Sequence, residues 1–233
     1  SMNYHLNKLL KKVTSVISIF AIITATSVGF STSAYAAAAN QTATVQTVYT
    51  TADDYTFTAA TATTTLAAAT GTAATFVTTA GTPTAWGITA GTLTVTTTIT
   101  TTANAALAIT LSGTGNLTIG GATVENATAG AMTLVLGGNT FTTTGAVTHA
   151  LAISGAGAVV VSGTTTFSDT IGAGTAVTSI TTATGKTTTF SAAVTATGAV
   201  TTTLTGAMTF AANATAGSFS IGTGGSMSVL GTT

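Results

Sequence analysis

The sequence has no cysteine and almost no charge. Disulfide bonds, thiolate metal sites and a lipidated N-terminal cysteine are therefore excluded. Charged residues make up 3% of the 233 residues, against about 25% in an ordinary soluble domain. The basic residues are four lysines, Lys8, Lys11, Lys12 and Lys186, and arginine is absent. Because no surface can neutralise a run of phosphates, the sequence predicts that nucleic acid is not a partner.

Large side chains are also scarce. Hydrophobic residues reach 45%, but much of that fraction is alanine, aromatic residues are 6%, and there is one proline. A thick core of large side chains is hard to build from this composition, whereas a thin core of small and β-branched residues in layers is easier. The abundance of threonine and valine argues against disorder, because disordered chains are rich in charge and poor in β-branched residues.

Residues 1–36 have the pattern of a signal peptide. Three of the lysines form a basic first part, an apolar run follows at 13–30, and Ser33-Ala34-Tyr35-Ala36 places small residues where a signal peptidase reads them. A membrane anchor is the alternative, because the run approaches the ~18 residues at which a spanning helix becomes plausible. Threonines and serines dilute that run. We therefore expect cleavage after Ala36, membrane contact only through a leader that is removed, and a secreted or outer-surface bacterial protein.

From residue 88 onward, short runs alternate apolar and hydroxyl side chains. In Gly91–Ile99, the apolar Leu93, Val95 and Ile99 fall on one face of a strand and the threonines on the other. The same spacing groups Leu107, Ile109 and Leu111; Leu117 and Ile119; Met132, Leu134 and Leu136; Leu151 and Ile153; Val159 and Val161; Ala192 and Val194; Val200 and Leu204; Met208 and Phe210; and Phe219 and Ile221. Glycine-containing corners separate the runs, and the phrase returns after roughly twenty residues, which indicates stacked repeats.

These patterns predict an all-β fold, a parallel β-helix (β-solenoid) over residues 88–233. Antiparallel β-sandwich domains are the alternative, and they should be rich in Asn-Gly or Asp-Gly hairpin turns. Neither dipeptide occurs in the sequence, which favours the solenoid. Residues 37–87 alternate less clearly and contain Pro83 and Trp86, so we expect them to form an N-terminal cap or first irregular strands that cover an open edge.

Two segments resemble the repeats of autotransporter passenger domains. They are LVLGGNTFTTTGAV (Leu134–Val147) and LAISGAGAVVVSGTTTFSDTIGAG (Leu151–Gly174). Residues 88–233 are also similar in composition to Thr/Ala/Gly-rich bacterial surface-antigen and surface-layer proteins. The resemblance implies a β-helical fold and display at the cell surface. The sequence departs from the autotransporter pattern because it has no series of transmembrane strands with aromatic girdles. A passenger fragment and a stand-alone secreted subunit therefore both stay open.

The sequence predicts no catalytic residue, no cofactor and no metal site. His149 is the one histidine after the leader, and a serine and Asp169 lie within reach along the chain. Such a trio arises by chance where hydroxyls are everywhere, so we interpret His149 as an exposed or turn-edge residue. Asp53 and Asp54 are adjacent carboxylates of the kind that calcium binds, but we interpret them as a solvated turn. We therefore expect no enzyme activity.

The function that the sequence favours is a secreted or cell-surface structural or adhesive protein. Its expected partners are other copies, through self-association at β edges, and a host or cell-surface ligand. The first alternative is a self-assembling surface-layer or filament subunit. The second is an ice-binding protein that uses Thr-x-Thr faces. The threonine-rich segments 92–96, 142–144, 164–166, 187–189 and 201–203 would supply such faces, but their irregular spacing argues against one continuous ladder.

Overall fold

The computed structural model describes most of the chain beyond the predicted leader. The described residues are 39–40, 45–46, 54–57, 63–66, 69–73, 75–78, 84–88, 91–95, 98–101, 106–125 and 131–231. They belong to the second of two compact units, Ala38–Thr233. Before residue 85 the description covers the strands and not their side chains. The predicted signal peptide, 1–36, lies outside the described residues.

The described residues form β-strands in three large sheets, which we name A, B and C, and in one two-stranded sheet described below. Sheet A contains β1 (Ala39–Asn40), β3 (Asp54–Phe57), β6 (Thr75–Thr78), β9 (Ile99–Thr100), β12 (Thr123–Val124), β15 (Val147–His149), β18 (Thr165–Phe167), β20 (Thr187–Phe190), β23 (Ala207–Phe210) and β26 (Ser226–Val229). Sheet B contains β2 (Val45–Gln46), β4 (Thr63–Leu66), β7 (Thr84–Ile88), β10 (Leu107–Leu111), β13 (Met132–Val135) and β16 (Ala152–Ser154). Sheet C contains β5 (Ala69–Ala73), β8 (Gly91–Val95), β11 (Asn116–Ile119), β14 (Thr140–Thr143), β17 (Ala158–Val161), β19 (Ser179–Thr182), β22 (Ala199–Thr202) and β25 (Ser218–Ile221). Within this described part, no helix is long and apolar enough to cross a bilayer.

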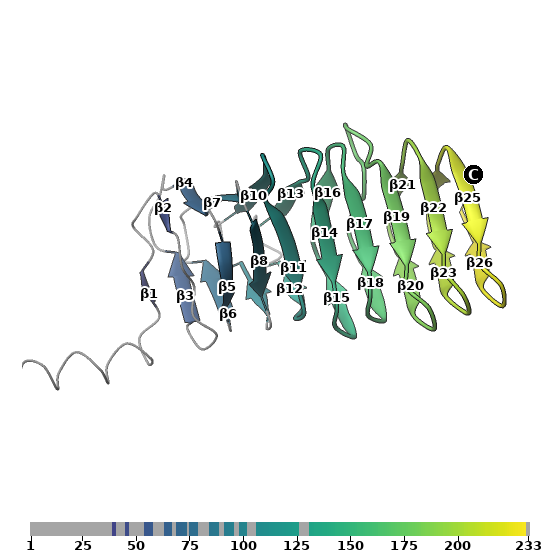
Figure 1. The fold of residues 1–233 in the computed structure, drawn as a ribbon, viewed down its shortest axis with the longest axis horizontal. Coiled ribbons are helices and arrows are strands. Elements are labelled where there is room, and N and C mark those ends of the chain that lie inside the picture. The colour runs from purple at the N-terminus through teal and green to yellow at the C-terminus, as the bar shows by residue number, and fades with distance from the viewer. Residues whose placement is uncertain are drawn as a thin grey trace, which may run out of the picture. The chain divides into compact units, whose positions relative to one another are not determined.

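The chain visits sheets B, C and A in turn and then repeats the circuit. β10, β11 and β12 make one such turn, and β13, β14 and β15 make the next, each strand pairing in parallel with its counterpart one turn earlier. Figure 1 shows the later strands lying side by side in this way. The fold is an all-parallel β-solenoid, with about seven turns in the part whose side chains are described. This confirms the predicted fold class and excludes the antiparallel sandwich.

Sheet B continues past β16 in a reduced form. An isolated bridge joins Ile153 to Ile171, and a second joins Ile171 to Val194. The two-stranded sheet of β21 (Val194–Thr195) and β24 (Ala214–Thr215) then extends the same side of the coil. The third side of the solenoid is therefore kept in the later turns by very short strands.

The interior is a column of inward-facing side chains from the three sheets. The strand burial patterns alternate as predicted; in β10, for example, Leu107, Ile109 and Leu111 are buried while the residues between them are exposed. Some predictions from the alternation are wrong. Leu204 is exposed because it occupies the tip of a turn after β22, and Phe219 and Ile221 of β25 are also exposed. Ile99 is buried as predicted, but it lies on sheet A and not on the strand of Leu93, which belongs to sheet C.

The turns of the solenoid contain different numbers of residues, and the extra residues lie in the corners between strands. One turn is 24 residues between the register partners Leu117 and Phe141, and 18 residues between the register partners Phe141 and Val159. At one corner, glycine is required by close approach of successive turns: a Cβ on Gly145 would lie 2.0 Å from the carbonyl oxygen of Gly120. The strands consequently stay in register although the sequence spacing varies.

Three phenylalanines form a stack along the inside of sheet A. The ring centroids of Phe167 and Phe190 are 5.5 Å apart, with planes inclined by 7°, and those of Phe190 and Phe210 are 4.8 Å apart, with planes inclined by 10°. All three rings are buried. Because each ring comes from a different turn, the stack ties consecutive turns together by burial and aromatic contact.

Candidate functional site

His149 is fully buried, so its interpretation as an exposed or turn-edge residue is wrong. The inward alternation that begins at Val147 places His149 and then Leu151 inside the coil. Nε2 of His149 lies 2.8 Å from Oγ1 of Thr143, and Nδ1 lies 3.3 Å from Oγ1 of Thr123. His149 therefore occupies the position of the next ring in the phenylalanine stack. The hydroxyls of Thr143 and Thr123 supply hydrogen-bond partners for its two ring nitrogens.

The environment of His149 keeps its imidazole neutral. Its ring packs against Phe141 in an edge contact at 5.8 Å and against Phe167 at 5.5 Å. Burial lowers the pKa of His149 to about 4, because the charged form loses its hydration. Its two ring nitrogens face threonines, and the Asp169 carboxylate instead accepts a hydrogen bond from the Thr170 backbone at 2.6 Å. The structure does not bring the Ser/His/Asp combination together.

Other inward threonines form polar contacts within the core, which the sequence alternation did not indicate. Oγ1 of Thr182 and Oγ1 of Thr188 lie 2.6 Å apart, both in buried side chains. Thr165 is also buried, with its hydroxyl 3.5 Å from that of Thr143. In the triplets 142–144, 164–166 and 187–189 the middle threonine is buried, because a strand residue two positions from an inward residue is also inward.

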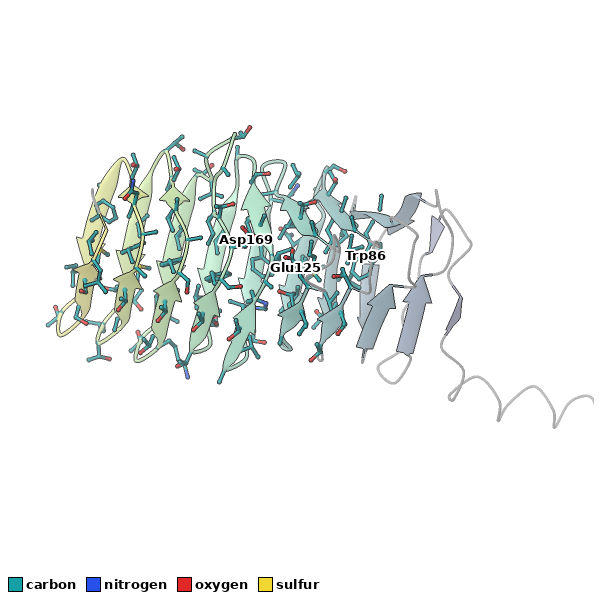
Figure 2. The ribbon with its side chains drawn as sticks, turned by 180° about the vertical axis from the view of Figure 1, so that it is seen from behind. Trp86, Glu125 and Asp169 are labelled. Atoms are coloured by element: carbon teal, nitrogen blue, oxygen red, sulfur yellow. The ribbon has the colours of Figure 1, made fainter. Side chains whose placement is uncertain are left out.

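Two carboxylates lie near each other on the central turns, at Glu125 and Asp169. Figure 2 shows both, with Trp86 nearer the N-terminal strands. Glu125 accepts a hydrogen bond from the Met132 backbone. Partial burial raises the pKa of Glu125, and the negative charge of Asp169 raises it further. The hydrogen bond from Met132 lowers the pKa but does not cancel the rise. Among the described residues, no three or more His, Cys, Asp or Glu side chains converge in a way that would hold a metal ion. Asp53 and the side chain of Asp54 lie outside the described part.

The outer face of sheet C carries side chains in two columns, and we call this surface the hydroxyl lattice. The first column is Thr94, Thr118, Thr142, Val160, Thr181, Thr201 and Ser220. The second, two residues earlier on each strand, is Thr92, Asn116, Thr140, Ala158, Ser179, Ala199 and Ser218. As expected, the threonine-rich segments do not form one continuous ladder, because 164–166 and 187–189 lie on sheet A and Val160 interrupts the first column on sheet C. The sheet C members remain in register although their sequence spacing varies.

Sheet A carries a second, shorter ladder. Thr148, Thr166, Thr189, Thr209 and Ser228 are consecutive register partners on its outer face. This explains why segments 164–166 and 187–189 do not join the lattice on sheet C: they belong to a different side of the coil. Charged residues flank the sheet A ladder, since Lys186 immediately precedes β20 and Asp169 follows β18 by two residues.

No family model, curated protein or solved structure matches this chain. The fold and the arrangement of the described side chains are therefore the basis for any functional proposal.

Proposed function

We propose that this chain is a secreted or cell-surface structural protein that acts through the outer faces of its solenoid. One observation carries the proposal: hydroxyl side chains stay aligned from turn to turn on two outer faces, in a protein with very few charges. A repeated surface of this kind suits contact with an extended partner. Display or adhesion by a bacterial surface protein is the role that agrees with both this surface and the export pattern of residues 1–36.

The solenoid also supports a structural role through its energetics. Each turn is held mainly by its neighbours, so stability is spread along the coil. Buried side chains such as Leu117, Phe141 and Val159 follow one another at the same position in successive turns. The structure can thus present a long surface without a thick core.

A filament subunit is the second candidate, because a solenoid of parallel strands can add the strands of another copy to its sheets. The inward-facing positions Phe219 and Ile221 on β25 are 39% and 52% exposed. The backbone edges of β25 and β26 are the ends of sheets C and A in the sheet order. In this second candidate the partner is another copy of the chain.

The experiment is expression of the full sequence in a bacterium, followed by fractionation and N-terminal sequencing. We expect a processed protein that begins at Ala37 and is recovered outside the cytoplasm. Substitution Ala36→Phe should leave the leader attached, because the peptidase requires a small residue there, whereas the matched control Ala38→Phe should be processed normally. Unprocessed protein in the cytoplasm, or anchored in the membrane fraction, would contradict the proposed export. Negative-stain microscopy of the processed protein then separates ordered filaments from single rods.

A further inference from the structure

The hydroxyl lattice has a defined two-dimensional repeat. Its rows are set by the distance between strands, about 4.8 Å, and its two columns by the two-residue rise along a strand, about 6.6 Å. Thr118, Thr142 and Thr201 are partly exposed members of one column. The surface therefore offers polar groups at fixed intervals in both directions.

The side chains of the lattice are held rigidly. A threonine has few χ1 rotamers because it is branched at Cβ. The residues between the lattice positions point inward and are buried, as Leu117, Phe141 and Ile180 are. The hydroxyls and methyl groups are thus ordered before any ligand arrives, which reduces the entropy lost on binding.

The chemistry of the lattice restricts the ligand. Each threonine hydroxyl both donates and accepts a hydrogen bond, and each methyl group is apolar. The lattice positions on the described strands carry no charged side chain, so a polyanion or polycation gains nothing from this surface. A matching ligand must itself repeat in two directions and must offer donors and acceptors equally. Ordered water at the surface of an ice crystal has both properties.

We propose that the outer face of sheet C binds ice through this lattice. The inference rests on the proposed function, in which the outer faces of the solenoid are the binding surfaces. It identifies the ligand of one of these faces as crystalline water. Sheet C is assigned rather than sheet A because Lys186 and Asp169 lie beside the sheet A ladder, and their strongly hydrated charges would disturb an ordered water layer. Val160 is the one aliphatic side chain larger than alanine in the lattice, and it interrupts the first column between Thr142 and Thr181.

The test is inhibition of ice recrystallisation by the purified processed protein, with thermal hysteresis measured in parallel. The unaltered protein should inhibit crystal growth. Thr181→Tyr should abolish inhibition, because a large ring stands above the flat lattice. Val160→Thr should increase it by completing the column. The matched control Thr189→Tyr, on the sheet A ladder, should retain the full effect.

Several results would overturn the inference. They are no inhibition by correctly folded protein, equal loss from Thr181→Tyr and Thr189→Tyr, or an unchanged effect after Thr181→Tyr. Two other occupants of the lattice are tested with the same variants. An insoluble polysaccharide would sediment together with the protein, and a second copy would form dimers that Thr181→Tyr abolishes. Either result, without ice activity, would mean that this occupant and not ice is the ligand of the lattice. Circular dichroism and fractionation are run on the same samples, so a protein that is exported and β-rich but inactive on ice contradicts this inference and leaves the proposed function intact.

Discussion

Acidification from pH 7.5 to pH 4 is expected to reduce the free energy of unfolding through His149 by about 3 kcal/mol, from the difference between its ordinary pKa and its folded value of about 4. The folded protein holds the neutral imidazole between two aromatic rings and two threonine hydroxyls. The unfolded chain binds a proton near pH 6.5, well before the folded chain does. The stability contributed by the neutral ring is therefore present above pH 6.5 and is lost progressively as the pH falls toward 4.

Urea unfolding at a series of pH values measures this effect. The variant His149→Gln keeps hydrogen-bonding groups but does not titrate, so its stability should change less between pH 7.5 and 4 than that of the unaltered protein. Glu125 acts in the opposite direction, because its raised pKa favours the folded protein at low pH. It is present in both proteins, and the difference between them isolates His149. Parallel pH profiles for the two proteins would show that His149 is not held neutral in the core.

Phe190→Ala is expected to destabilise the solenoid by about 3–5 kcal/mol, the range for removing a buried aromatic ring. Phe190 is 1% exposed and stacks on both Phe167 and Phe210, so its loss leaves a cavity that touches three turns. Because each turn contacts mainly its neighbours, the damage should be local and the turns beyond residue 190 should unfold first. Hydrogen exchange should then show faster exchange in β23 and β26 than in β10 and β11.

The matched control for this substitution is Leu204→Ala. Leu204 is 55% exposed at the tip of a turn, so its truncation should change stability by no more than about 0.5 kcal/mol. Similar losses of stability for the two variants would contradict the assignment of the aromatic stack as a core element. A single cooperative loss of all turns in Phe190→Ala would contradict the local character of the packing.

The sequence predicted the fold class because two signals agreed. Alternation at Leu107–Leu111 and at Met132–Leu136 identified inward faces, and the lack of Asn-Gly and Asp-Gly turns argued against hairpins. The ends of strands were less predictable. Alternation continues through a corner when the residues there happen to match it, which is why Ile99 was assigned to the strand of Leu93.

The surfaces could not be predicted because they depend on register. Thr181 and Thr201 become neighbours, and Thr142 joins the same column across Val160, through strand pairing between turns of different length, and no fixed sequence period reveals that. His149 had a readable signal, the alternation from Val147 to Leu151, but its polarity made the outward assignment attractive. The threonines that satisfy it come from two other strands, and only the folded chain places them beside the ring.

The account depends on parallel stacking in the observed register, and distances between spin labels on sheet C test it most directly. The absence of cysteine allows clean labelling of Thr94→Cys with Thr201→Cys, and of Thr118→Cys with Thr201→Cys. Five strand spacings separate positions 94 and 201, and four separate positions 118 and 201. The distance between the two spin labels should therefore be about 24 Å in the first pair and about 19 Å in the second, a difference of one strand spacing. Distances that do not shorten by one spacing between the two pairs would contradict the register, and the hydroxyl lattice with it.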